Sequence, residues 1–382
     1  MNRNVRHQEG TGTDHPSRPF LDPELSAHLF GSLSRAGQRL KAERYVGGLL
    51  ALPGRKTLRN ISSQFEGVAA QQSVHHFIST SPWEWMPIRR TLARHVQRTL
   101  APEAWVIRPT VIPKAGPHSI GVDHQYLPHL GLAVKGQQAV GAWLASSRSA
   151  VPVDWQLRLS GRWLEDPLRQ RAGIPSDVTA GSLEACVREL VAHVAVATDV
   201  QAGPVVVDVE GIDAVALARH LSATGLEYLV QVGAGDQLRL DRTKLPKFGD
   251  RERTAGELAA QLTRLRHRVD PGDGPMMAAA IPVVVPSGGR GDGMLLVGEW
   301  RGGEAVPRLW LTSADGPSLV RLLRLTRLPS VVARDFAAIS EGVGMKDFAG
   351  RSFPGWHRHV TLASVAHHVA AMRGASLPAR TP

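Results

Sequence analysis

The chain changes its hydrophobic periodicity near residue 100, and this change restricts the possible folds more than any other feature of the sequence. Between residues 22 and 100, apolar residues recur at spacings of three and four, broken at Pro53-Gly54, Gly67 and Ser81-Pro82. Such spacing predicts helices. From Ala104 onward, apolar residues alternate with polar ones, as they do in strands. We therefore expect an all-α N-terminal domain over 23–100 and a mixed α/β domain over 104–373.

The second domain shows an informative order of elements. Strands are predicted at 106–107, 120–122, 139–143, 151–159, 204–208 and 228–232, and helices at 182–198 and 213–223. A run of strands followed by alternating helices and strands is the order of a ribonuclease-H-like mixed sheet with flanking helices.

The rest of the chain adds an insertion, closing helices and two polar ends. Gly-rich turns separate strand-like runs at 281–285, 294–297 and 308–311, which predicts a β-rich insertion over about 233–315. Helices are expected at 318–327, 331–339 and 356–372. The remaining segments, 1–22 and 374–382, predict a disordered lead and a flexible tail.

The charge balance favours a nucleic-acid partner. The chain has 45 Lys and Arg against 34 Asp and Glu, a net charge of +11, and arginine grips phosphate with a planar fork of donors. The alternative is a basic protein from an Arg-rich proteome. A single cysteine, Cys186, fits a reducing compartment. With no run of 18 apolar residues and no apolar export signal, we expect a cytoplasmic, nucleoid-associated protein without a membrane or small-molecule partner.

Two short helix patterns, 57–66 and 70–79, flank a turn at Gly67 and resemble a helix-turn-helix. The second helix would expose side chains able to hydrogen-bond base edges, and basic residues nearby could meet phosphates. The alternative is an ordinary helical pair with a solvated face. The residues predicted to contact DNA here and elsewhere are Arg55, Lys56, Arg59, Gln71, Gln72, His75, His76, Arg89, Arg90, Lys114 and Arg351.

Several ordered motifs carry a family resemblance. They are Arg44-Tyr-Val-Gly-Gly-Leu-Leu, His75-His76-Phe77, Pro113-Lys114-x-Gly116-x-His118-Ser119-Ile120-Gly121-Val122, Trp163-Leu164-Glu165-Asp166 and Gly344-Met345-x-Asp347-Phe348-x-Gly350-Arg351-Ser352. In this order they resemble the insertion-sequence transposases of the DDE superfamily, in the group with a Tyr-Arg-Glu-Lys signature and a β-rich insertion. The resemblance covers residues 44–368.

The resemblance implies three acidic residues, and two of them are lost. Aligned with the family motifs, Asp208 is the second acid, but Pro109 stands at the first and Ala333 at the third, and Arg108 replaces the acidic neighbour of the first. The Tyr, Arg and Lys positions of the signature hold Thr326, Pro329 and Ser340. Such enzymes need the carboxylates to hold two divalent metals about 3.5–4 Å apart.

A lone Asp208 should not hold that metal pair, and its alternative role is a hydrogen bond to the next helix's N-terminus. Of the other acids, Asp123 is the candidate for a displaced ligand, whereas Asp335 should point to a different helical face than Ala333. The histidines near the C-terminus have no cysteine or carboxylate cluster with them, so no metal site is predicted. They are His357, His359, His367 and His368.

These observations favour a transposase-derived protein without nuclease activity. We expect it to bind double-stranded DNA sequence-specifically as a homodimer, with transcriptional regulation as its role, and to need no cofactor. One alternative is an active DDE transposase that cuts and joins DNA with displaced acids and Mg²⁺. The other is a protein that pairs with an active transposase and modulates it.

Overall fold

The computed structural model describes residues 21–65, 67–116, 118–127, 131–179, 181–196, 203–247, 251–272, 274–285, 293–302, 304–313 and 318–374. The predicted lead at 1–22 and tail at 374–382 lie outside this part of the chain, apart from residues 21, 22 and 374. The prediction of disorder there stays a prediction.

The first elements of the described part of the chain are helices, as the periodicity predicts. They are α1 (Pro23–Phe30), α2 (Ala36–Ala51), α3 (Leu58–Ile61), the 3-10 turn η1 (Ser62–Gln64), α4 (Ala70–His75), the π-helical turn η2 (His76–Thr80) and α5 (Met86–Leu100). The Asp22 carboxylate caps α1 by accepting from the backbone N–H of Glu24 and Leu25. At the end of this helical segment, α5 stops at Ala101, whose backbone takes a left-handed φ of 46°.

The predicted helix-turn-helix is present in a shortened form. Its first helix, predicted over 57–66, consists of one α-helical turn, α3, followed by η1. Its second helix, α4, runs on through η2 to Thr80. The turn between them contains Gly67 with a φ of +92°, a conformation that glycine adopts without strain. Ile61, Val74 and Phe77 anchor the pair in the core.

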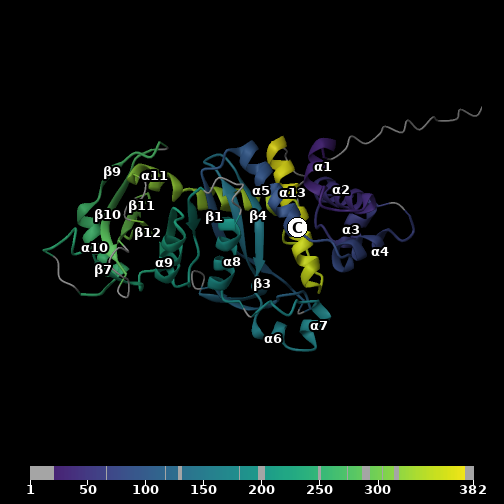
Figure 1. Cartoon of the computed structure of the whole chain (residues 1–382), viewed down its shortest axis with the longest axis horizontal. Helices are drawn as coiled ribbons and strands as arrows, with labels where there is room; N and C mark the ends of the chain where they lie inside the picture. The colour runs from purple at the N-terminus through teal and green to yellow at the C-terminus, as the bar shows by residue number, and fades with distance from the viewer. Residues whose placement is uncertain are drawn as a thin grey trace, which may run out of the picture.

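The sheet is built around β1 (Ala104–Pro113). This strand pairs antiparallel with β3 (Leu132–Ala145) and parallel with β5 (Val205–Val207), which pairs parallel with β6 (Tyr228–Val232). On its far edge, β3 pairs antiparallel with β4 (Ala150–Leu157) and, nearer its start, with β2 (Asp123–Leu127). The order β4-β3-β1-β5-β6 is that of a ribonuclease-H-like sheet, so the predicted mixed α/β fold is confirmed (Figure 1).

One predicted strand is wrong. The apolar residues at 120–122 predict an extended segment, but the chain turns there and β2 starts at Asp123. Gly121 has a φ of +72°, which breaks the extended backbone. The backbone N–H of Ile120 bonds to the carbonyl of Gly350 at 3.1 Å, so this apolar stretch packs against a distant loop rather than against a neighbouring strand.

The β-rich segment extends the main sheet. Within the described residues, β12 (Arg308–Ser313) pairs antiparallel with β6 and continues the sheet to β11 (Gly293–Trp300) and β10 (Met276–Val284). The remaining elements here are β7 (Gln237–Leu240), β8 (Arg253–Thr254), α10 (Ala255–Leu265) and β9 (His267–Val269). Figure 1 shows this green half at the opposite end of the molecule from α1–α4.

Helices cover the sheet and connect its strands. They are α6 (Gly161–Leu164), α7 (Leu168–Ala172), α8 (Leu183–Val196), α9 (Ala214–Thr224), α11 (Leu319–Leu325), α12 (Leu328–Asp335) with the π-helical turn η4 (Phe336–Ser340), and α13 (Phe353–Arg373). Figure 1 places α13 between the N-terminal helices and β4, and nearly all of α13 is buried. One apolar cluster therefore runs from Leu21 to Ala370 through both predicted domains.

Candidate active site

Asp208 directly follows the carboxyl end of β5 and lies beside the middle of the parallel strand β1. The Val205–Val207 strand is fully buried, and its register pairs Ile107 with Val207. The backbone N–H of Asp208 continues this ladder by bonding to the carbonyl of Ile107 at 3.0 Å. Ligands of open α/β sheets bind at such carboxyl ends. This is the position to which the family resemblance assigns the second catalytic acid.

Two arginines contact the Asp208 carboxylate. Arg108 Nε donates to Asp208 Oδ2 at 3.0 Å, and Arg308 Nη2 lies 3.6 Å from Asp208 Oδ1. Because the Asp208 side chain is only 9% exposed, its charge needs a partner of opposite sign. The alternative that Asp208 caps the next helix is wrong, since the carboxylate of Asp213 caps α9.

The two replaced positions on β1 differ in direction. Neighbouring residues on a strand point to opposite faces of the sheet, and it is Arg108 whose side chain reaches Asp208. Pro109 therefore projects from the opposite face of β1, although it also lines the cavity at this site. The side chain of β1 that contacts Asp208 is therefore a positive guanidinium and not a carboxylate.

The third position also has no carboxylate. On α12 and η4, Val332 and Phe336 face the site from one side of the helix, while Ala333 beside them is half-buried. Asp335 is turned elsewhere, since its carboxylate accepts from the backbone N–H of Ala150 at 2.7 Å and from Arg334 Nε at 2.8 Å. The expectation that Asp335 points away from the site agrees with these contacts.

The middle of β1 and the end of β5 border a cavity of about 830 Å³. Its lining includes Arg108, Arg158 and Arg308 and, among the described residues, only two carboxylates, Asp208 and Glu210. Asp123, the candidate displaced ligand, is outside this lining, and its Oδ1 accepts from the backbone N–H of His124 at 2.8 Å.

These residues do not fit a two-metal centre. Mg²⁺ requires anionic oxygen ligands, whereas both oxygens of Asp208 already face guanidinium groups and Glu210 is the single further carboxylate in the described lining. Over the part of the chain that the structure describes, no group of three or more His, Cys, Asp or Glu side chains is placed to hold a metal.

Most of the residues predicted to contact DNA are on the surface. In the N-terminal helices, the exposed ones are Arg55, Arg59, Gln71, Gln72, His75, His76 and Arg90. Arg351 is also exposed, but it lies elsewhere, at a cavity of about 350 Å³ that His118, Arg162 and Arg171 also line. The four polar side chains predicted to contact bases therefore share one helical segment, and Arg351 belongs to a separate basic cluster.

The prediction that Lys56 and Lys114 contact DNA is corrected by their burial. Lys114 Nζ donates to the carbonyls of Lys346 and Phe348, both at 2.7 Å, and burial lowers its pKa to about 8. Lys56 is 2% exposed, its ammonium donates to the carbonyl of Leu52, and its backbone N–H bonds to Asp347 Oδ2 at 2.8 Å. Both lysines hold the loop after η4 in place.

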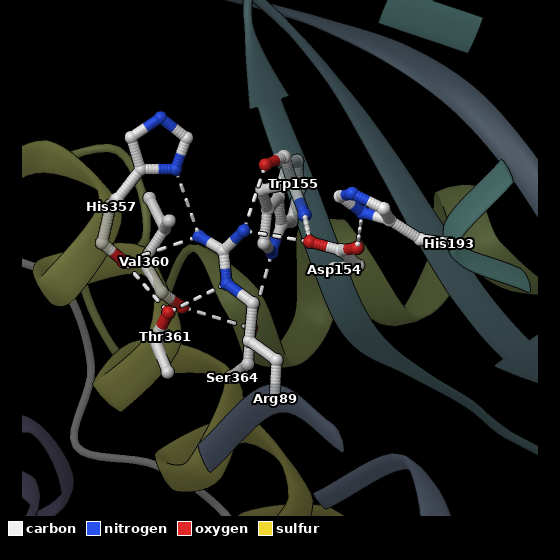
Figure 2. A network of polar contacts seen from close by, with 8 residues as sticks. All are labelled: Arg89, Asp154, Trp155, His193, His357, Val360, Thr361 and Ser364. Carbon is white, nitrogen blue, oxygen red and sulfur yellow. Dashed lines mark hydrogen bonds and ion pairs between the residues drawn. The ribbon is translucent and has the colours of Figure 1, made fainter. Parts of the chain in front are cut away.

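The prediction for Arg89 is corrected in the same way. This residue is 2% exposed and forms an ion pair with Asp154 on β4 at 2.7 Å. Figure 2 shows its guanidinium surrounded by protein groups. Its other bonds go to the carbonyl of Trp155 at 2.9 Å, to Thr361 Oγ1 at 2.8 Å and to the carbonyl of His357 at 3.2 Å. Arg89 therefore ties α5 to β4 and α13.

The four C-terminal histidines are buried in α13. His359 Nδ1 shares a hydrogen bond with the Tyr45 hydroxyl, and His367 Nδ1 shares one with Ser340 Oγ, both at 2.8 Å. Burial lowers the pKa of His359, His367 and His368 to about 4 and that of His357 well below its usual value. These histidines are therefore part of a tightly packed terminal helix.

Two cavity residues carry no signal in the sequence. Arg308 lies 100 residues after Asp208, inside the β-rich segment, and Arg158 follows β4. Neither belongs to a motif. Arg308 reaches the site because β12 pairs beside β6, a long-range pairing that no local pattern encodes.

Comparison with known proteins gives one family. Residues 28–276 match the model of the family described as DDE superfamily endonuclease. The match covers more than half of the chain and includes Pro109 and Asp208, and it ends before Ala333. No curated protein matches this sequence. None of the helices in the described part of the chain has both the length and the apolar character needed to cross a membrane.

Proposed function

Because the chain belongs to the DDE superfamily of endonucleases, we propose that it is a transposase-derived protein that binds double-stranded DNA without cutting it. The observation that carries this proposal is the occupation of the Asp208 carboxylate by Arg108 and Arg308. In a two-metal mechanism, the carboxylates must hold cations that activate the attacking oxygen and stabilise the leaving one. A fixed guanidinium can neutralise Asp208 but supplies no metal-bound nucleophile.

Two features support DNA as the partner. The net charge of +11 attracts a polyanion, and family membership associates the fold with DNA. The exposed face of α4 and η2 offers hydrogen-bonding side chains that suit base edges in a groove, namely Gln71, Gln72, His75 and His76. We propose this face as the sequence-reading surface, and regulation of transcription near related DNA sites as the role.

The nuclease half of the proposal is tested with supercoiled plasmid and element-end duplexes. Purified protein should neither nick nor join them in Mg²⁺ or Mn²⁺. The competing function is an active nuclease that uses Glu210 together with Asp208, and the observation in its favour is that both line one cavity. Metal-dependent scission that is lost in both Asp208→Asn and Glu210→Gln would establish that enzyme and overturn the proposed inactivity.

The binding half is tested by the salt dependence of affinity. If four to eight phosphates are contacted, log K against log salt should fall with a slope of about −4 to −7. Replacing Gln71, Gln72, His75 and His76 with Ala should cost about 1–3 kcal/mol of discrimination between cognate and random DNA per lost base contact. Arg55→Ala, the matched phosphate-type control, should weaken both DNAs alike. A flat salt response contradicts DNA binding, and unchanged discrimination removes α4 as the reading helix.

A further inference from the structure

The cavity at the former catalytic position contains three guanidinium groups from distant parts of the chain. Arg108 comes from β1, Arg158 follows β4, and Arg308 comes from β12. With Asp208 and Glu210 as the carboxylates of the lining, the described lining residues carry three positive and two negative charges. A DDE site with its three acids carries three negative charges before metal binds. The sign of the site is therefore reversed.

The arginines are placed so that a ligand can reach them. The side chains of Arg108 and Arg308 remain 36% and 34% exposed while contacting Asp208. Arg108 uses Nε for that contact, and the 3.6 Å approach of Arg308 is longer than a hydrogen bond. Both guanidinium groups therefore keep donors that can turn to an anion in the cavity.

Arg158 is held in place by neutral groups. Its Nη1 donates to the side-chain oxygens of Gln125 at 2.6 Å and Gln138 at 3.0 Å, and its Nε donates to the carbonyl of Gly181 at 3.2 Å. Its positive charge has no carboxylate partner among the described residues. A rigid, uncompensated arginine in a concave site is a pre-organised donor for an anionic oxygen.

We propose that this cavity is a metal-independent phosphate site in which Arg108 and Arg308 bind the oxygens of a phosphate group, while Arg158 adds positive charge to the same cavity. The inference rests on the proposed loss of the metal centre. Asp208 acts as an internal counterion that the incoming phosphate displaces from Arg108 and Arg308. The volume of about 830 Å³ is within the range of about 300–1,000 Å³ typical of ligand sites. The phosphate belongs either to a DNA strand or to a small phosphorylated molecule.

The test is calorimetric titration of inorganic phosphate into the full-length protein in EDTA. We expect saturable binding without divalent metal. Arg108→Gln should weaken it at least tenfold, because a charge-assisted hydrogen bond is lost. Asp208→Asn should strengthen it at least threefold, because both arginines lose their counterion. Arg264→Gln, at an exposed arginine on α10 outside the cavity lining, is the matched control and should change nothing.

Opposite effects of Asp208→Asn and Arg108→Gln on phosphate affinity would identify the cavity as the binding site. If phosphate binds only with Mg²⁺ and Asp208→Asn abolishes it, Asp208 is a metal ligand and the proposal is wrong. Phosphate binding that is equal in wild type and Arg108→Gln also overturns it. Because Arg108→Gln leaves a buried carboxylate with one partner fewer, the double variant Arg108→Gln/Asp208→Asn provides a charge-neutral version, which should bind more weakly than Asp208→Asn alone.

Competition then separates the two sources of phosphate. If duplex DNA displaces inorganic phosphate and Arg108→Gln weakens DNA binding, the ligand is a backbone phosphate. If a nucleoside monophosphate displaces it and duplex DNA does not, the ligand is a small phosphorylated molecule. The failures are also distinguishable. If the protein binds DNA but not inorganic phosphate, only this inference is contradicted. If it binds phosphate but not DNA, the proposed function is contradicted.

Discussion

Replacing Arg89 with methionine should destabilise the protein strongly and leave its DNA contacts unchanged. The Arg89 guanidinium is buried against Asp154 on β4 and bonds to Thr361 on α13. Methionine fills the space of the aliphatic stem but removes the charge, so Asp154 keeps only His193 and its neighbour's backbone N–H. Removing one partner of a buried ion pair costs about 3–5 kcal/mol.

That magnitude is large compared with the usual free energy of unfolding of about 5–15 kcal/mol. The assay is urea unfolding followed by circular dichroism, together with DNA affinity measured over a range of salt. Arg90→Met is the matched control, since Arg90 is the exposed neighbour on the same helix. It should leave stability within about 0.5 kcal/mol. Of the two variants, only Arg90→Met should bind DNA more weakly or show a shallower slope of log K against log salt.

The cost of Arg89→Met should also depend on pH. The hydrogen bond between His193 and Asp154 raises the pKa of His193. When His193 is protonated, its positive charge partly replaces the charge lost with Arg89. A group whose pKa is raised on folding stabilises the protein below its unfolded pKa, and this contribution is lost as the pH rises through the folded value. The difference between wild type and variant should therefore be smaller at pH 6 than at pH 8. Two findings contradict the argument: an unchanged free energy of unfolding, or a DNA defect in Arg89→Met that Arg90→Met does not share.

Three shorter predictions address other buried groups. Burial lowers the pKa of His367 to about 4. Between pH 6.5 and 4, this histidine is therefore protonated in the unfolded chain but neutral in the folded protein, so the free energy of unfolding should fall as the pH is lowered. In that window, His367→Gln should reduce the slope of unfolding free energy against pH by about 1.4 kcal/mol per unit; an unchanged slope excludes His367 as a source. Burial raises the pKa of Cys186 to about 11, so the thiol should not react with Ellman's reagent at pH 8 until urea unfolds the chain, and fast labelling of the folded protein is the contrary result. Gly344→Ala should lower the free energy of unfolding by more than the roughly 1–2 kcal/mol that a left-handed backbone costs an alanine, because the new Cβ would lie 2.3 Å from Lys56 Cγ. Gly54→Ala is the control, because Gly54 also has a positive φ but has nothing within 4 Å of the added Cβ. Equal losses of stability for the two variants in urea unfolding would rule out the clash.

The helices and strands that the sequence predicts correctly are those with a clear local period. The helical segment before Leu100 and the buried valines before Asp208 both depend on spacing alone, and local spacing survives folding. The wrong strand at 120–122 is apolar for another reason. Its residues pack on a distant loop through the bond from Ile120 to Gly350, and periodicity contains no information about such a partner.

The basic side chains show the same division at the level of function. Arg89 and Arg90 are consecutive arginines, and only their positions around the helix make Arg89 buried and Arg90 exposed. The sequence predicts surface contacts for Lys56 and Lys114 because lysine is almost never fully buried. They are covered because the loop around Asp347 and Phe348, more than 200 residues further along the chain, accepts from the backbone N–H of Lys56 and from the ammonium of Lys114.

The sequence by itself determined which side chains stand at the positions that the family resemblance assigns to the first and third acids. Pro109 and Ala333 are not carboxylates, so the family's set of three acids is incomplete however the chain folds. Only the tertiary structure decided what replaced them. The pairing of β12 with β6 brings Arg308 to Asp208, and the parallel register of β1 and β5 brings Arg108 to the same carboxylate. The identity of a residue is local, whereas the electrostatic character of a cavity depends on which distant strands meet at its rim.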